Sequence, residues 1–143
     1  MVRVNIINPK YLTDQHLIAE YLEILMLVSA VKNHPTTSLD KIPKNYKLGT
    51  GHILFFKNKL KYLQQRHEKI KREMLRRGFA PKKKLSLAGI PKSLLKGWKA
   101  SSKDKQIIKK RLIERINRKP QWYTYYKQHK SRDFLVNLIK KAD

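Results

Sequence analysis

The chain has 143 residues, of which 34 are Lys or Arg and only 10 are Asp or Glu, so its formal net charge is +24. It contains no cysteine, which excludes disulfides, thiolate zinc sites, iron–sulfur clusters and cysteine nucleophiles. Leu, Ile, Val and Phe together occupy 40 positions, enough for a folded core. A chain of this length is expected to form a single domain over residues 1–143.

Membrane and export signals are not expected in this sequence. The longest apolar run, from Ile24 to Val31, is far shorter than the roughly 18 residues that a membrane span needs. Residues 1–11 contain charges and a proline but no apolar stretch typical of a signal peptide. We therefore expect a protein without a membrane partner, located in the cytoplasm or nucleoid.

The positive charge is distributed unevenly along the chain. Residues 1–40 hold 3 basic and 4 acidic residues, whereas residues 41–143 carry a net charge of +25. Such an excess predicts a polyanionic partner, because neutralising phosphates releases counterions. DNA, ribosomal RNA and acidic membrane are the candidates from charge alone. Glu20 and Glu23 need a separate explanation, because a protein that only coats nucleic acid has no evident use for both acids in one short stretch.

The first helix is predicted over residues 14–33, with Thr13 or Asp14 as its N-cap. One apolar stripe recurs at 4-3-4-3 spacing: Leu17, Tyr21, Ile24, Val28 and Val31. Further apolar residues on the other side indicate a helix that is buried nearly all round. A narrow polar strip interrupts this surface and includes His16, Glu20 and Glu23. Two carboxylates in such a place need partners, because an unpaired buried carboxylate costs several kcal/mol.

The second helix is predicted as one continuous element from about residue 51 to residue 77, after a loop over residues 34–50. Its apolar residues alternate at spacings of three and four: Ile53, Phe56, Leu60, Leu63, His67, Ile70 and Met74. Gly78 follows as the residue that ends the helix. Residues 79–95 are rich in Lys, Pro and Gly, so we expect an irregular basic segment there.

A third helix is predicted from Ser101 or Ser102 to just before Pro120, followed by an aromatic block and a short amphipathic helix over residues 133–141. No alternating apolar pattern indicates a sheet. The fold prediction is therefore all-α: a single compact domain of three main helices, with long irregular loops and a short C-terminal helix.

Several short motifs occur in a defined order along this framework: Arg3 and Asn5, Asp14-Gln15-His16-Leu17, Ala19-Glu20-Tyr21 with Glu23, Leu48-Gly49, Gly51-His52, Phe55-Phe56, Lys59-Leu60, Arg76-Arg77-Gly78-Phe79, and Pro120 with Trp122-Tyr123 and Tyr125-Tyr126. Together they resemble the phage-type pyrimidine-dimer DNA glycosylases with abasic-site lyase activity, also called ultraviolet endonucleases. The resemblance covers about residues 2–126, is slight over residues 79–101, and excludes the tail over residues 131–143. A virus-encoded source is compatible with it.

The resemblance implies a covalent mechanism. The family's nucleophile is the α-amine exposed when Met1 is removed, which here belongs to Val2. It attacks C1′ of the damaged nucleotide, displaces the base and forms an imine that undergoes β-elimination. An α-amine suits this role because its pKa of about 7.7–8.0 leaves more of it unprotonated than a lysine with a pKa near 10.4. Glu23 matches the family's catalytic carboxylate, which stabilises the developing positive charge and moves protons.

The DNA contacts are predicted partly from the resemblance and partly from charge and aromatic content. The candidates are Arg3, Gln15, His16, Arg111, Arg115, Lys119, Trp122, Tyr123 and Tyr125. Arg111, Arg115 and Arg118 share one face of the third helix. A solvated surface is the alternative use of such a face, but in a protein with this charge and these motifs we expect it to contact phosphates. His16 is either a DNA contact or a satisfied polar group, and the aromatic block is divided between core and DNA.

The expected partner is duplex DNA carrying a damaged or abasic nucleotide, bound by a monomer without cofactor. A metal site is not expected, because His52 and His67 lack a third ligand at metal spacing. Positions 22 and 26 are arginines in the best-known members of the family, whereas this chain has Leu22 and Met26. Two alternatives remain open: the same chemistry on a different modified base, and a non-catalytic basic protein that binds nucleic acid.

Overall fold

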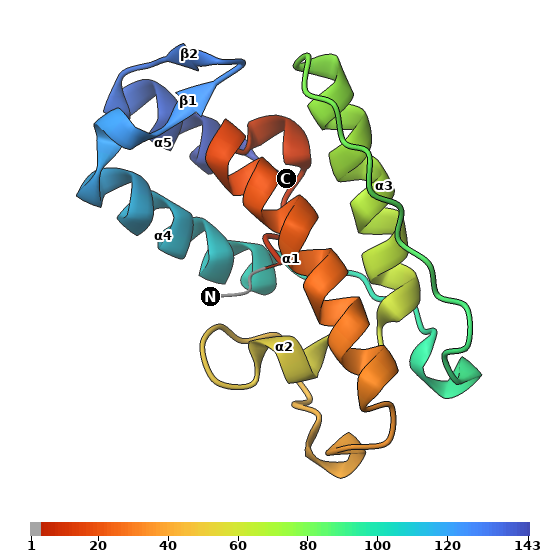
Figure 1. Ribbon diagram of the computed structural model, residues 1–143. Coiled ribbons are helices and arrows are strands. Elements are labelled where there is room, and N and C mark those ends of the chain that lie inside the picture. Colours follow the sequence, from red (N-terminus) through yellow and green to blue (C-terminus); the bar gives the residue numbers. More distant parts are fainter. Residues whose placement is uncertain (1–3) are drawn as a thin grey trace.

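The computed structural model describes residues 4–143 and is all-α apart from one very short hairpin (Figure 1). The predicted fold class is confirmed. The helices are α1 (Asp14–Asn33), α2 (His52–Phe55), α3 (Leu60–Arg76), α4 (Ser102–Arg118) and α5 (Arg132–Lys141). The strands are β1 (Thr124–Tyr125) and β2 (Gln128–His129).

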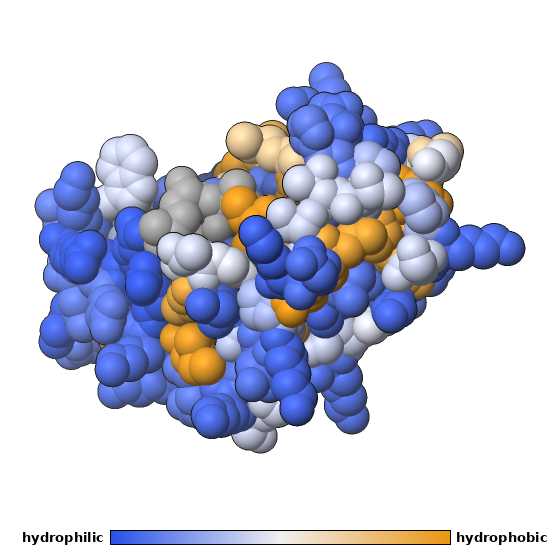
Figure 2. Space-filling model, turned by 90° about the horizontal axis from the view of Figure 1, so that it is seen from below, coloured by the Kyte–Doolittle hydropathy of each residue, from blue (hydrophilic) through white to orange (hydrophobic). Residues whose placement is uncertain are grey.

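Helix α1 lies in the middle of the molecule, between α3 on one side and α4 on the other (Figure 1). It packs most extensively against α3, while α5 packs against α4. One apolar core joins these elements and includes Leu17 and Ile24 of α1, Leu63 of α3, Leu112 of α4 and Leu135 of α5. Hydrophilic side chains cover most of the face seen in Figure 2, with separate apolar patches between them.

Helix α1 begins where its cap predicts and buries the predicted stripe. The Thr13 hydroxyl accepts a hydrogen bond from the His16 N–H, and the five stripe residues are all buried. The expectation that the helix is buried nearly all round is wrong. The side chains of Leu22 and Met26 are 41% and 61% exposed. Among residues 4–143 no element covers this side of α1, so these two apolar side chains face solvent.

The predicted continuous helix over residues 51–77 is also wrong, because the chain leaves the helical path between α2 and α3. Lys59 has a non-helical backbone and forms an isolated β-bridge with Leu95. Its ammonium group donates a hydrogen bond to the Phe55 carbonyl (2.8 Å), one of the groups that the end of α2 leaves open. The apolar spacing hides this break, because Phe56 and Leu60 on either side of it enter the same core.

The region beyond α3 follows the sequence expectation more closely. Gly78 has a φ of +85° and ends α3 as predicted. Residues 79–101 are irregular apart from one 3₁₀ turn, and they run alongside α3 (Figure 1). The Tyr21 hydroxyl fixes this segment to α1 by accepting a hydrogen bond from the Lys83 N–H (2.7 Å). The third and C-terminal helices lie within one residue of their predicted starts.

The β1–β2 hairpin was not predicted, and its turn explains why. Tyr126 and Lys127 have φ values of +50° and +65°, a conformation that usually requires Gly or Asn. The carboxylate of Asp14 stabilises this turn by accepting hydrogen bonds from the N–H groups of both residues (3.1 and 2.7 Å). The hairpin therefore depends on Asp14, a residue more than 100 positions earlier in the sequence.

A buried ion pair fixes the N-terminal segment, residues 4–8, to the helices. Arg66 of α3 donates two hydrogen bonds to the carboxylate of Glu20 (2.7 and 3.0 Å) and one to the Ile7 carbonyl. Both side chains are almost fully buried. Glu20 therefore has the partner that a buried carboxylate needs, and its role is structural. Ile6 has a φ of +46°, a strained conformation for a β-branched residue, so the segment turns sharply there.

Candidate active site

A cavity of about 210 Å³ opens between α1, α4 and the aromatic segment before β1. Its lining includes seven of the predicted site residues: Gln15, His16, Glu23, Arg111, Arg115, Trp122 and Tyr123. Asn5, Ala19 and Leu112 complete it. Residues from four separate parts of the chain therefore meet around one hollow.

Glu23 reaches this cavity because of its position on α1. It lies one helical turn after Ala19, which also lines the cavity, and it is partly buried. Glu20, three residues earlier, is directed toward α3, where it pairs with Arg66. The two acids that the sequence places together thus serve different sites: Glu20 holds the scaffold, and Glu23 lines the cavity.

Arg111 and Arg115 line the cavity from α4, one helical turn apart. Both are partly exposed, and the ion pair of Arg111 with Glu114 is long (3.8 Å). Such an exposed pair contributes little to stability, so Arg111 remains available to an anion. The cavity therefore combines one carboxylate with two guanidinium groups, a charge pattern suited to a phosphate-bearing ligand next to a reacting centre.

Aromatic rings form the remaining wall. The ring of Tyr123 lies 4.8 Å from that of His16, centroid to centroid, and burial raises the pKa of its hydroxyl although Arg115 opposes the shift. His16 is also tied to Thr13 through its Nδ1 (2.9 Å). Trp122 is different, because its side chain is 64% exposed at the edge of the cavity. Its indole presents a free surface for stacking.

The aromatic wall is held in place from the start of α1. The side chain of Gln15 accepts a hydrogen bond from the Thr124 N–H (2.9 Å) and donates one to the Thr124 hydroxyl (3.1 Å). Asp14 accepts a hydrogen bond from the same hydroxyl (2.7 Å). Burial alone would raise the pKa of Asp14, but the hydrogen bonds from Thr124 and Lys127 and the charge of Arg77 outweigh burial and lower it. Asp14 is therefore held as a carboxylate.

Arg77 is the other anchor of this region. It donates hydrogen bonds to Glu73 (2.8 Å), Asp14 (3.0 Å) and the Leu12 carbonyl (2.8 Å). Its guanidinium lies over the ring of Tyr125 at 4.7 Å. The Arg76-Arg77-Gly78 motif thus has a structural use, which is to fix the end of α3 to the start of α1 and to the hairpin.

Two of the predicted site residues that the structure describes do not line the cavity. The hydroxyl of Tyr125 donates to the Lys10 carbonyl (2.8 Å), so its contacts are to protein. Lys119 is exposed at the end of α4. Val2 and Arg3 lie outside the described residues. The catalytic role of Val2 and the DNA-binding roles of Arg3, Lys119 and Tyr125 stay predictions.

Asn5 is a site residue that the sequence prediction left out. It lines the cavity, only 3% of it is exposed, and its Oδ1 is buried without a hydrogen-bond partner in residues 4–143. A buried acceptor needs a donor, and none of the described residues supplies one. The signal was present in the sequence, since Asn5 belongs to the first motif of the resemblance.

Two side chains form hydrogen bonds with the backbone of Val4. Its N–H donates to Nε2 of His52 (2.8 Å), and its carbonyl accepts from the hydroxyl of Tyr46 (3.2 Å). Nδ1 of His52 lies 2.9 Å from the Lys47 carbonyl. Because Nε2 accepts and Nδ1 faces a carbonyl, the ring is neutral with its proton on Nδ1. We call this arrangement of Tyr46 and His52 the Val4 clamp.

A family model for pyrimidine dimer DNA glycosylases matches residues 1–87 of the chain. The chain belongs to this family. The match contains the N-terminal segment, α1 with Glu23, and the Val4 clamp. The glycosylase residues Arg111, Arg115, Trp122 and Tyr123, which form the other side of the cavity, lie beyond the matched region.

Two further findings concern this glycosylase as a whole. In residues 4–143, no group of three His, Asp or Glu side chains is arranged to hold a metal ion. Within the same range, no helix is both long enough and apolar enough to cross a membrane.

Proposed function

We propose that this DNA glycosylase is also an abasic-site lyase that acts on cyclobutane pyrimidine dimers through the α-amine of Val2. The observation that carries the proposal is the cavity in which Asn5 and Glu23 meet. Asn5 is three residues from Val2, and Val4 is clamped by its backbone, so the N-terminal segment is fixed close to the Glu23 carboxylate.

The chemistry proceeds in four steps. The amine lone pair forms a bond to C1′, and the glycosidic C1′–N bond breaks, with the base leaving on the bonding pair and taking a proton from the amine. The sugar ring then opens as C1′–O4′ breaks and O4′ takes a proton from water, which gives a protonated imine. Loss of a proton from C2′ expels the 3′-phosphate, which cuts the strand, and water later hydrolyses the imine to release the enzyme.

Glu23 is assigned two tasks in this sequence. Its carboxylate stabilises the positive charge that builds up on the sugar and the imine, and it accepts the proton lost from C2′ during elimination. Its partly buried position strengthens both effects, because charges interact more strongly where water is excluded.

The remaining residues of the cavity are assigned to binding. Arg111 and Arg115 pair with phosphates on the strand that enters the cavity, and Trp122 stacks on a base next to the lesion. The nucleotide must leave the helical stack before the amine can reach C1′, and an exposed indole stabilises such a distorted duplex.

Borohydride trapping tests the proposal directly. Mature protein incubated with a duplex containing an abasic site, in the presence of borohydride, should give a covalent adduct that mass mapping places on the N-terminal peptide. Glu23→Gln should abolish turnover while DNA binding falls little, because the amide keeps the size but not the charge. An adduct on an internal lysine, or full activity after the N-terminus is acetylated, would show that Val2 is not the nucleophile.

A second candidate is the same chemistry on a different modified base. Leu22 and Met26 favour it, because they are exposed on α1 within one turn of Glu23 and cannot donate hydrogen bonds to phosphate. A panel of duplexes with different lesions separates the two candidates. Turnover of another lesion without any turnover of dimers would select the alternative. A non-catalytic binding protein would give no adduct with any duplex.

A further inference from the structure

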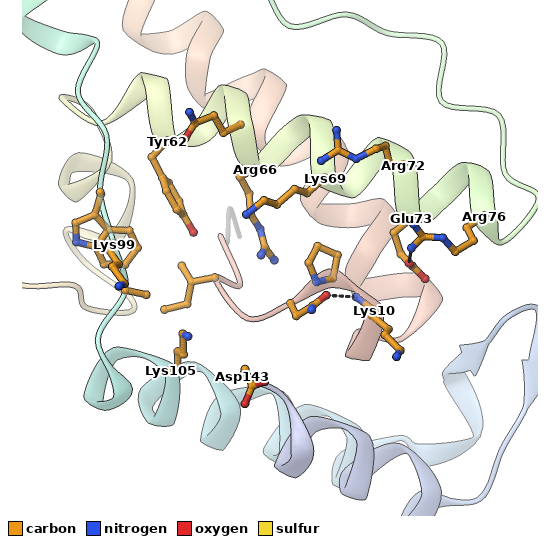
Figure 3. A pocket seen from close by; sticks show the side chains of 16 residues that line it. Lys10, Tyr62, Arg66, Lys69, Arg72, Glu73, Arg76, Lys99, Lys105 and Asp143 are labelled. Carbon is orange, nitrogen blue, oxygen red and sulfur yellow. Dashed lines mark hydrogen bonds and ion pairs between the residues drawn. The ribbon is translucent and has the colours of Figure 1, made fainter.

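A second, larger cavity lies between α3, the N-terminal segment and the start of α4 (Figure 3). Its volume is about 510 Å³. Figure 3 shows Lys69 projecting from α3 toward the N-terminal segment, with Lys99 and Lys105 on the far side of the hollow. Basic side chains from separate parts of the chain thus surround one space, which we call the basic cavity. No step of the proposed chemistry uses it.

Most of this positive charge is not neutralised by the protein. The side chains of Lys69, Arg72, Lys99 and Lys105 form no hydrogen bond or ion pair within residues 4–143.

The acids of the lining offer little compensation. Glu73 is already paired with Arg76 and Arg77, which leaves Asp143 as the one lining acid without an ion pair in the described chain. Several like charges around a hollow with protein walls raise the local positive potential and repel each other. Binding of an anion relieves that repulsion.

The two cavities are separate sites. They share no lining residue. The N-terminal segment is the wall between them, because Asn5 faces the cavity of Glu23 while Ile6 and Asn8 face the basic cavity. A DNA segment in the first cavity therefore does not need the side chains of the second.

We propose that the basic cavity binds the phosphate groups of a second DNA duplex while the first cavity holds the lesion. The ligand chemistry is that of phosphate anions, and DNA is the source because the family acts on it. The protein would thus hold two DNA segments at once and pass directly from one to the other during its search. The inference rests on DNA as the substrate and not on the lyase step.

A ternary-complex experiment tests this inference. The protein is first saturated with a short duplex carrying a non-cleavable abasic analogue, and a fluorescent undamaged duplex is then added. We expect the second duplex to bind, measured by anisotropy. The triple variant Lys69→Gln, Arg72→Gln, Lys99→Gln should bind the second duplex at least tenfold more weakly, because each phosphate contact contributes counterion release. Its affinity for the abasic analogue should be unchanged.

The matched control is Lys84→Gln, Lys92→Gln, Lys103→Gln, which removes the same charge from exposed lysines outside both cavities. It should still bind the second duplex. All six substitutions are at exposed side chains, and thermal unfolding of each variant confirms that it folds.

The outcomes distinguish the proposed second DNA site from the proposed lyase mechanism. Absence of a ternary complex with the wild-type protein, or equal loss in both triple variants, would overturn the second site. Binding of inorganic tripolyphosphate is measured as well. If the cavity variant loses affinity for tripolyphosphate but not for the second duplex, the cavity is a small-anion site, and the proposal of a second DNA site is overturned. Failure of borohydride trapping leaves this binding test unaffected and contradicts only the lyase mechanism.

Discussion

Removal of the His52 ring should impair imine formation more than it impairs folding. In His52→Ala the N–H of Val4 loses its acceptor while its surroundings stay buried. A buried donor without a partner costs about 1–3 kcal/mol. The ring also contacts Tyr46 at 5.6 Å and Phe56 at 5.4 Å, so some packing energy is lost in addition.

The effect on chemistry follows from the position of Val4. Once one side of the Val4 clamp is missing, the hydrogen bond from Tyr46 is what remains of the clamp on the chain two residues from the proposed amine. A displacement of about 1 Å in a reacting group can cost on the order of 100-fold in rate. We therefore expect single-turnover borohydride trapping to slow by about that factor, while the affinity for abasic DNA changes little.

His67→Ala is the matched control for this experiment. Like His52, His67 is buried, has a ring nitrogen on a backbone carbonyl (Tyr21, 3.1 Å) and lies against an aromatic ring (5.0 Å), but its hydrogen bond is to α1 and not to the N-terminal segment. Urea unfolding should show a similar loss of stability in both variants, with slow trapping only in His52→Ala. Equal trapping rates, measured on fully folded protein, would refute the positioning role and leave His52 as a packing residue.

Three further predictions concern binding, lesion choice and stability. Arg111→Ala and Arg115→Ala should each reduce the slope of log affinity against log salt by about one unit, measured on any duplex, if each contacts one phosphate. Leu22→Arg with Met26→Arg should raise cleavage of dimer DNA relative to abasic DNA in matched salt, because each new charge-assisted contact is worth about 1.5–3 kcal/mol. Asp14→Asn should lower the free energy of unfolding by about 1–3 kcal/mol at neutral pH. Because the pKa of Asp14 is lowered in the folded protein, its contribution is present above pH ~3.9 and is lost as the pH falls through the folded value, so the two proteins should converge in acid-unfolding curves.

The sequence predicted those elements whose signals are local. The caps Thr13 and Ser101 mark the starts of α1 and α4, and each accepts the expected hydrogen bond. The break before Leu60 was missed because both sides of it keep a helical spacing of apolar residues. The exposure of Met26 was missed for a related reason: apolar character shows what a residue prefers, and not which surfaces remain uncovered.

The cavity around Glu23 was only partly predictable. Residue type and motif order indicated most of its lining, but nothing in the sequence joins Asn5 to α4. The Val4 clamp and the Asp14 turn were beyond prediction, because each depends on backbone groups meeting side chains tens of residues away. Such contacts leave no periodic pattern. The family model ends at residue 87, before α4 begins, so it too covers only one side of the cavity.

The end of the family match divides the cavity into two parts. The carboxylate and the N-terminal segment belong to the matched part, while the arginines and aromatic rings opposite them do not. Under the proposed mechanism, exchange of residues 88–143 between relatives would replace the wall assigned to DNA binding and leave Val2 and Glu23 in place. Asp14 sets the limit on such chimeras, because any incoming segment must present a turn whose N–H groups meet its carboxylate. A chimera that meets this condition would combine the proposed chemistry with a different DNA-binding wall.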